Sequence, residues 1–254
     1  MKKLIFIISL FFTLACNCQV PSIGGMQFPR AAASGEGDAS NIVTDYGGGS
    51  LAAAYNDTIA LLYPYEQIAT YPTYLANNEI LIASIITPTS YTFTAPAGWE
   101  IIYQDSHPNA SVAYFWKRAD GTELRAGTIG FDKSTSANAI GYIHGFIGCI
   151  TTGTPFDGLQ TVAVNLNDSV YIPELTSAGS RYAVGVILVE DNTYTNSFTN
   201  YVELINVATT NATDLELEYG GLLVTAAGTV SQEDVPLSGT DYWSSIGLLL
   251  IAQP

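Results

Sequence analysis

Acidic side chains gather in two short segments of the chain where they could bind a cation. Asp120 and Glu123 lie in "DGTE", and Glu190 and Asp191 lie in "VEDNTYTN". Calcium prefers hard oxygen ligands such as carboxylates, so both segments are candidate calcium sites. The same residue types are typical of turns, where their side chains bind nearby backbone groups. Calcium is one interpretation of these segments, and turn chemistry is the other.

The sequence lacks other arrangements that metal binding or catalysis needs. The only histidines, His107 and His144, are far apart and have no cysteine at ligand spacing, so we expect no zinc site. There is no G-x-S-x-G segment and no glycine-rich phosphate loop. Glu216 and Glu218 alternate with apolar residues in "LELEY", so we expect them to face solvent rather than to pair as in a glycosidase. These patterns predict a protein that is not an enzyme and that needs no cofactor, unless it binds calcium.

Aromatic residues offer a second kind of candidate site. Tyr63, Tyr65, Tyr71 and Tyr74 crowd into "YPYEQIATYPTY". Aromatic rings pack on sugar faces while their polar ends stay wet, so these tyrosines could form a glycan-binding platform. The other interpretation is that they cover the edges of a β-sandwich.

Trp99 raises the same question in "PAGW". Pro96 and Gly98 predict a turn, and Trp99 then begins a strand with Ile101 and Tyr103 on the same face. We expect Trp99 to plug the open end of the core rather than to grip a ligand.

Some residues are candidates for covalent modification. Asp57-Thr58-Ile59 and Asp168-Ser169-Val170 resemble an O-glycosylation pattern of some bacteria, with Thr58 and Ser169 as acceptors. Thr13-Leu14-Ala15-Cys16 resembles a lipobox, which predicts lipidation of Cys16. Cys149 lies in the apolar "GYIHGFIGCI", where a buried and inert thiol is expected.

Residues 1–18 have the layout of a secretory or lipoprotein signal. Lys2 and Lys3 precede an apolar run from Leu4 to Ala15, which is too short to span a bilayer comfortably. Lipidation of Cys16, ordinary cleavage near Cys18 or Gln19, and an uncleaved anchor helix are the three alternatives. We expect an extracellular or outer-surface protein that touches the membrane only through a lipid anchor or an uncleaved N-terminal helix.

The elements that must position these residues are β-strands. Residues 19–58 are rich in Gly, Ala, Ser and Asp, and we expect a flexible or assembly leader there. Residues 59–254 consist of short apolar runs rich in Val, Ile, Thr, Tyr and Phe, separated by turn residues. This predicts an all-β, antiparallel, jelly-roll-like β-sandwich. The predicted core is Ile80, Ile82, Trp99, Ile101, Tyr114, Trp116, Ile143, Val184, Val186, Leu215, Leu217, Leu248 and Leu250.

The sandwich shows a faint internal repeat. "NEILIASIIT", "GWEIIYQ", "SVAYFWKRA" and "AIGYIHGFIG" occur in the same order as "SRYAVGVILV", "YVELINV", "DLELEYG" and "WSSIGLLLIA". Two pseudo-repeated halves that close one core would explain this order, and so would chance.

Charge excludes one class of partner. The chain has 8 Lys and Arg against 23 Asp and Glu, a net charge of −15. Such a surface repels phosphate backbones, so we expect no nucleic-acid binding.

An ordered set of segments, "NNEILIASI", "APAGWEII", "ASVAYFWKRADGTE", "AIGYIHGFIG" and "TPFDG", resembles a known β-sandwich module. This PAGW-type module recurs in phage tail or fibre proteins and in secreted bacterial surface proteins. The resemblance covers roughly residues 72–252. It implies a non-enzymatic structural or attachment protein on a cell surface, in a filament or on a virion. A carbohydrate-binding, lectin-like module is the alternative. The leader is either a flexible tether or a strand that docks on a neighbouring copy and so drives self-association.

Overall fold

The computed structural model describes residues 43–45, 66–71, 77–88, 90–123, 128–133, 139–158, 161–190, 198–208 and 215–254. Within these ranges the chain forms β-strands and no helix, so none of its described segments is a helix able to cross a membrane. All paired strands are antiparallel. The all-β sandwich predicted from the sequence is confirmed.

The first half of the chain forms a five-stranded and a three-stranded sheet. Its strands are β1 (Val43–Asp45), β2 (Glu66–Thr70), β3 (Ile80–Thr87), β4 (Phe93–Thr94), β5 (Glu100–Ser106), β6 (Ser111–Arg118), β7 (Thr128–Lys133) and β8 (Ile140–Ile147). The five-stranded sheet has the order β1-β8-β3-β6-β5, and the three-stranded sheet has the order β2-β7-β4. The strand β1 comes from the predicted leader, so the sandwich reaches back beyond the predicted boundary at residue 59.

The second half forms another five-stranded sheet and a two-stranded ribbon. Its strands are β9 (Thr161–Ile172), β10 (Leu175–Ser177), β11 (Arg181–Glu190), β12 (Val202–Ala208), β13 (Leu215–Val224), β14 (Gly228–Val230) and β15 (Glu233–Leu250). The sheet has the order β12-β13-β11-β15-β9, and β10 pairs with β14.

The two halves share one strand order. Counted from β5, the strands of the first five-stranded sheet follow the order β5-β6-β3-β8-β1. The strands of the second follow the order β12-β13-β11-β15-β9, so each strand has a counterpart at the same place in the other sheet. The pair β2–β7 corresponds in the same way to β10–β14, whereas β4 has no counterpart in the described part of the second half. This agreement supports the two pseudo-repeated halves indicated by the sequence. The jelly-roll description remains a prediction.

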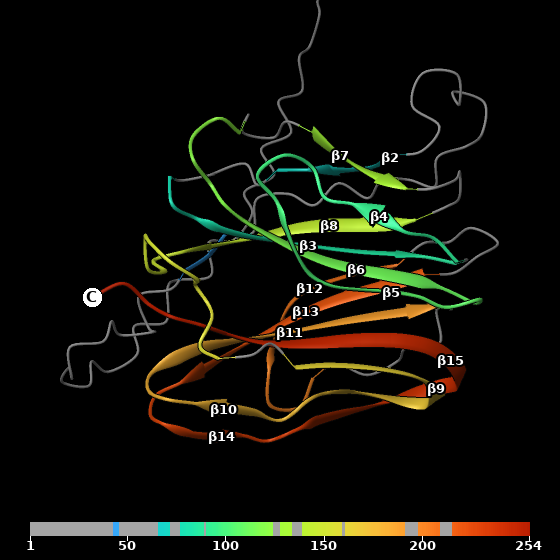
Figure 1. The fold of residues 1–254 in the computed structure, drawn as a ribbon. Coiled ribbons are helices and arrows are strands. Elements are labelled where there is room, and N and C mark those ends of the chain that lie inside the picture. Colours follow the sequence, from blue (N-terminus) through green and yellow to red (C-terminus); the bar gives the residue numbers. More distant parts are fainter. Residues whose placement is uncertain are drawn as a thin grey trace, which may run out of the picture.

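The sheets stack in four layers (Figure 1). The three-stranded sheet, the two five-stranded sheets and the β10–β14 ribbon follow one another, and an apolar cluster fills each of the three spaces between them. Because side chains alternate along a strand, Ile82 of β3 packs between the five-stranded sheets while Leu81 packs beneath the three-stranded sheet. A strand that is covered on both faces is apolar at nearly every position. This explains the sequence of β3, "ILIASIIT", which is buried throughout.

The predicted core is buried at all but two positions. Trp116 is half-buried at the rim of the central cluster, and Ile101 is 45% exposed. Ile101 was predicted to share a face with Trp99 and Tyr103. A bulge in the β5–β6 pairing between Ile101 and Tyr103 breaks that alternation. Tyr103 therefore packs on the central cluster and Trp99 on the outer one. Ile101 pairs with Phe115 and keeps the face of Trp99, but it lies on the edge strand β5 and is largely exposed, so the core prediction for Ile101 is wrong.

The strand β15 is much longer than the sequence indicated. It begins at Glu233, well before the segment "WSSIGLLLIA", and it pairs along β9 up to Ile172. Pro236 interrupts the expected pattern because proline cannot donate a ladder hydrogen bond. The structure accommodates it beside a register shift between Pro236 and Asp241.

Candidate functional site

The "ADGTE" segment after β6 folds into a tight turn. Ala119 N–H donates to Glu79 O at 2.8 Å, which extends the pairing with the chain before β3. The Asp120 carboxylate accepts hydrogen bonds from the Thr122 N–H at 2.9 Å and the Thr122 hydroxyl at 2.6 Å. Gly121 has a φ of +86°, a conformation that favours glycine. The Asp-Gly-Thr sequence thus specifies the turn locally.

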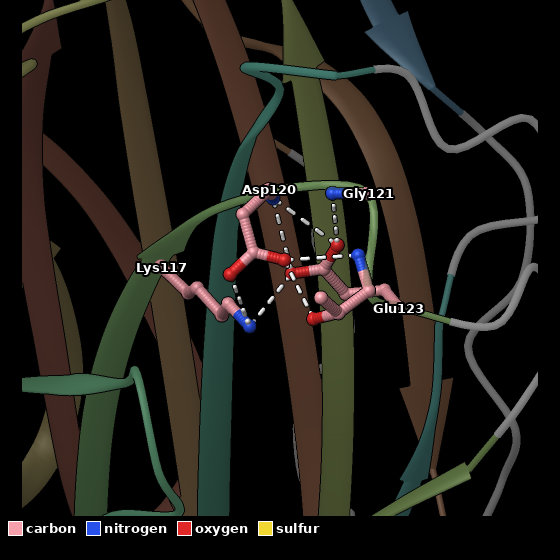
Figure 2. A network of polar contacts seen from close by, with 5 residues as sticks. Lys117, Asp120, Gly121 and Glu123 are labelled. Carbon is pink, nitrogen blue, oxygen red and sulfur yellow. Dashed lines mark hydrogen bonds and ion pairs between the residues drawn. The ribbon is translucent and has the colours of Figure 1, made fainter.

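Lys117 joins the carboxylates of this turn (Figure 2). Its Nζ lies 2.7 Å from Glu123 Oε1 and 3.6 Å from Asp120 Oδ2. The Glu123 carboxylate also accepts the N–H groups of Asp120 at 3.2 Å and Gly121 at 3.0 Å. The Glu123 side chain is 1% exposed and that of Lys117 is 9% exposed, whereas that of Asp120 is 57% exposed. The turn is therefore anchored by one buried ion pair.

Protonation states in the turn suit this arrangement. Burial acts to lower the pKa of Lys117, but the hydrogen bond and charge of Glu123 outweigh it, and the pKa is raised. The hydrogen bonds from Thr122 lower the pKa of Asp120. Both groups are charged at neutral pH.

Calcium was one prediction for Asp120 and Glu123, and the structure corrects it. The Lys117 ammonium lies between the two carboxylates and supplies the positive charge that the prediction gave to a metal ion. Among the described residues no group of three or more His, Cys, Asp or Glu side chains could hold a metal ion. The turn interpretation explains both residues.

An aromatic cluster adjoins the turn. Trp99 is 5% exposed, and its ring lies 5.3 Å from that of Phe131 and 6.4 Å from that of Tyr71. Trp99 N–H donates to Pro96 O at 3.0 Å, which closes the "PAGW" turn. A Cβ on Gly98 would lie 3.4 Å from Lys117 Nζ, so this turn and the ion pair are in contact. The core-plug prediction for Trp99 is confirmed.

Tyr71 belongs to the same cluster. It is 6% exposed, and burial raises its pKa. Because its ring is covered by Trp99, Tyr71 cannot present a face to a sugar, and the platform prediction is wrong for this residue. Tyr63, Tyr65 and Tyr74 lie outside the described residues.

The remaining predicted sites are not brought together. Glu190 is the half-buried last residue of β11 and pairs with Leu215. Ser169 is half-buried in β9 opposite Pro236, and its modification remains a prediction. Asp191, Cys16 and Thr58 lie outside the described residues. Cys149 is buried and free, which confirms its predicted burial, and burial raises its pKa to about 12.

Sequence reasoning missed a polar network between the two five-stranded sheets. The hydroxyls of Ser84 and Tyr219 lie 2.7 Å apart, and the Tyr114 hydroxyl donates to Ser244 Oγ at 3.0 Å. The His144 ring stacks on Tyr219 at 5.3 Å, and burial lowers its pKa to about 3, so it stays neutral. Single polar residues inside otherwise apolar strands are the signal that could have indicated this network.

Buried acids on the second five-stranded sheet were also missed. Glu216 is 5% exposed and Glu218 is 1% exposed, so the prediction that they face solvent is wrong. Both faces of β13 are covered, which burial at every position from Leu215 to Gly221 shows. Burial raises the pKa of Glu216 to about 7, against the effect of its hydrogen bond with Asn206.

The predicted leader contributes the edge strand β1. It pairs with the end of β8 in the register Val43↔Ile147, Thr44↔Phe146 and Asp45↔Gly145. A segment ahead of the predicted domain therefore adds a strand to a sheet edge of its own chain through main-chain hydrogen bonds, and docking on a neighbouring copy stays a prediction.

Comparisons of the chain with protein-family models, with curated proteins and with solved structures found no match. Three features of the molecule itself therefore bear on its function. These are the stacked halves with one strand order, the internally satisfied turn at Lys117, and the edge strand supplied by the leader.

Proposed function

We propose that this protein is a non-enzymatic structural or attachment module that works outside the cell, on a cell surface, in a filament or on a virion. The observation that carries the proposal is the stacking of two halves with one strand order through a continuous apolar core. Repeated β-units packed over a large shared core make a stiff block, which suits a mechanical or spacing role.

The chemistry of the reactive side chains supports this role. The imidazole of His144 has a pKa near 3 and the thiol of Cys149 has a pKa near 12, so neither is a base or a nucleophile at neutral pH. The Lys117 amine is charged and bound to Glu123. These protonation states suit structural positions better than they suit general-base or nucleophilic catalysis at neutral pH.

The N-terminal sequence and the net charge support an external location. A signal-like segment with Cys16 in a lipobox-like context precedes the sandwich, and the net charge of −15 favours a soluble, repulsive surface. The leader would then connect an anchor to the sandwich while contributing β1 to its first sheet.

Surface labelling tests the proposal. Antibodies against the sandwich should label intact cells or particles in electron microscopy, and mass spectrometry of the native protein should find no peptide that begins before residue 16. A matched Cys16→Ser variant should lose membrane association while the sandwich still folds and leaves the cytoplasm. Labelling that appears only after the cells are opened would overturn the proposal.

A further inference from the structure

The two halves of the protein differ in how their equivalent edge strands are built. The strand β9 closes the second five-stranded sheet with 12 residues that pair along β15. Its counterpart β1 closes the first sheet with 3 residues, which in the described part of the chain pair with Gly145–Ile147 of β8. The edge strand of the first half is therefore held by a much shorter ladder.

The connections to the rest of each half differ as well. β9 ends at Ile172 and β10 begins at Leu175, so β9 is tied to its own half. β1 ends at Asp45 and β2 begins at Glu66. A chain spans at most about 3.3–3.6 Å per residue, so the 20 residues between the two strands set an upper limit of roughly 66–72 Å on their separation. That length allows the strand to reach either its own sheet edge or the edge of a neighbouring molecule.

We propose that the edge of β8 at Gly145–Ile147 is a strand-acceptor site, and that in the assembled protein its occupant is Val43–Asp45 of a second copy. The ladder uses main-chain groups, so a second copy makes the same contacts in the same register as the chain's own strand. The free energies of the two pairings are nearly equal, and local concentration selects between them.

The proposed surface role, on which this inference rests, supplies that concentration. A strand on a tether competes at an effective concentration of the order of millimolar. Copies held side by side on a surface reach similar local concentrations, so pairing between copies competes with pairing within one chain. Because β1 of one copy binds β8 of the next, the contact is heterologous and can propagate as a ring or filament.

Two single-cysteine chains test the exchange. In the full chain with Cys16, Cys18 and Cys149 replaced by serine, one variant carries Val43→Cys and the other carries Ile147→Cys. These positions are register partners, so their cysteines come within reach of a disulfide only when the strands pair. The two variants are mixed at millimolar concentration and oxidised, and a disulfide-linked heterodimer is expected on non-reducing gels. Adding Thr44→Pro to the first variant should abolish it, because proline disrupts the short ladder.

The second half of the protein supplies a matched control. Ser169 and Pro236 are register partners on the equivalent edge, so a mixture of Ser169→Cys and Pro236→Cys chains should give no heterodimer, since β9 is tied to β10. The double variant Val43→Cys/Ile147→Cys reports pairing within one chain. An intramolecular bond in that variant with no heterodimer in the mixture would overturn the inference. Failure to form either bond would overturn it too.

Light scattering of the parent chain is an independent readout. The average mass of the parent should rise with concentration, whereas that of the Thr44→Pro variant should stay constant. A monomer found in all these experiments would leave the surface-labelling test of function unaffected.

Discussion

Replacing Trp99 by alanine measures how much the outer core of the first half depends on one side chain. Trp99 is 5% exposed and contacts the rings of Phe131 and Tyr71. An aromatic side chain buries about 150–250 Å², which at about 25 cal/mol per Å² corresponds to roughly 4–6 kcal/mol as an upper bound. Replacement of buried aromatic residues by alanine costs about 3–5 kcal/mol. We expect a loss in that range for Trp99→Ala.

Urea unfolding followed by circular dichroism gives the free energy of unfolding of parent and variants. A loss of this size lowers the melting temperature of a protein this large by about 6–20 °C. Trp116→Ala is the matched control, because Trp116 is half-buried at the rim and its indole N–H donates to Glu100 Oε2 at 3.1 Å. Its loss should be clearly smaller. Trp99→Phe keeps a ring in the cluster and should lie between Trp99→Ala and the parent. If Trp99→Ala unfolds at the same urea concentration as the parent, Trp99 is not a core residue and the reasoning fails.

Three further predictions follow from buried charges and close packing. Lys117→Met leaves Glu123 buried without its partner and should lower the free energy of unfolding in urea by about 3–5 kcal/mol. Adding Glu123→Gln should restore much of that loss. Equal losses in the single and double variants would contradict the ion pair. Burial raises the pKa of Glu216 from 4.5 to about 7, so the folded state holds this proton more tightly than the unfolded chain does, and the stability from this group is lost as the pH rises from about 4.5 to 7. The stability gained by Glu216→Gln should therefore be larger at about pH 8 than at about pH 5, and a gain independent of pH would show that the carboxyl is not buried. Gly220→Ala should lower the free energy of unfolding by about 1–3 kcal/mol, because the new Cβ would lie 2.5 Å from the ring of Phe198. An unchanged melting temperature would mean that this ring moves aside freely.

Local sequence patterns were sufficient for the fold class and for several side chains. Runs rich in β-branched and aromatic residues between turn residues predicted an antiparallel β-sandwich, and the structure has it. The "PAGW" turn and the apolar surroundings of Cys149 correctly placed Trp99 and Cys149 inside. Even the faint repeat in the sequence matches the shared strand order of the two halves. These features depend on residues close together in the chain, whose preferences act before any tertiary contact forms.

Tertiary structure decided which faces are covered and which distant groups meet. Alternation correctly put Glu216 and Glu218 on the face opposite Leu217, but only tertiary packing on both sides of β13 buries that face, where Phe198 and Tyr201 lie over Gly220. A single bulge, which no local pattern announced, moved Tyr103 to the face opposite Trp99. Pairs such as Ser84 with Tyr219 come from different halves of the chain. The alternation of side chains along a strand determines which residues share a face. The environment of that face depends on what packs against it, and the packing partners are far away in the sequence.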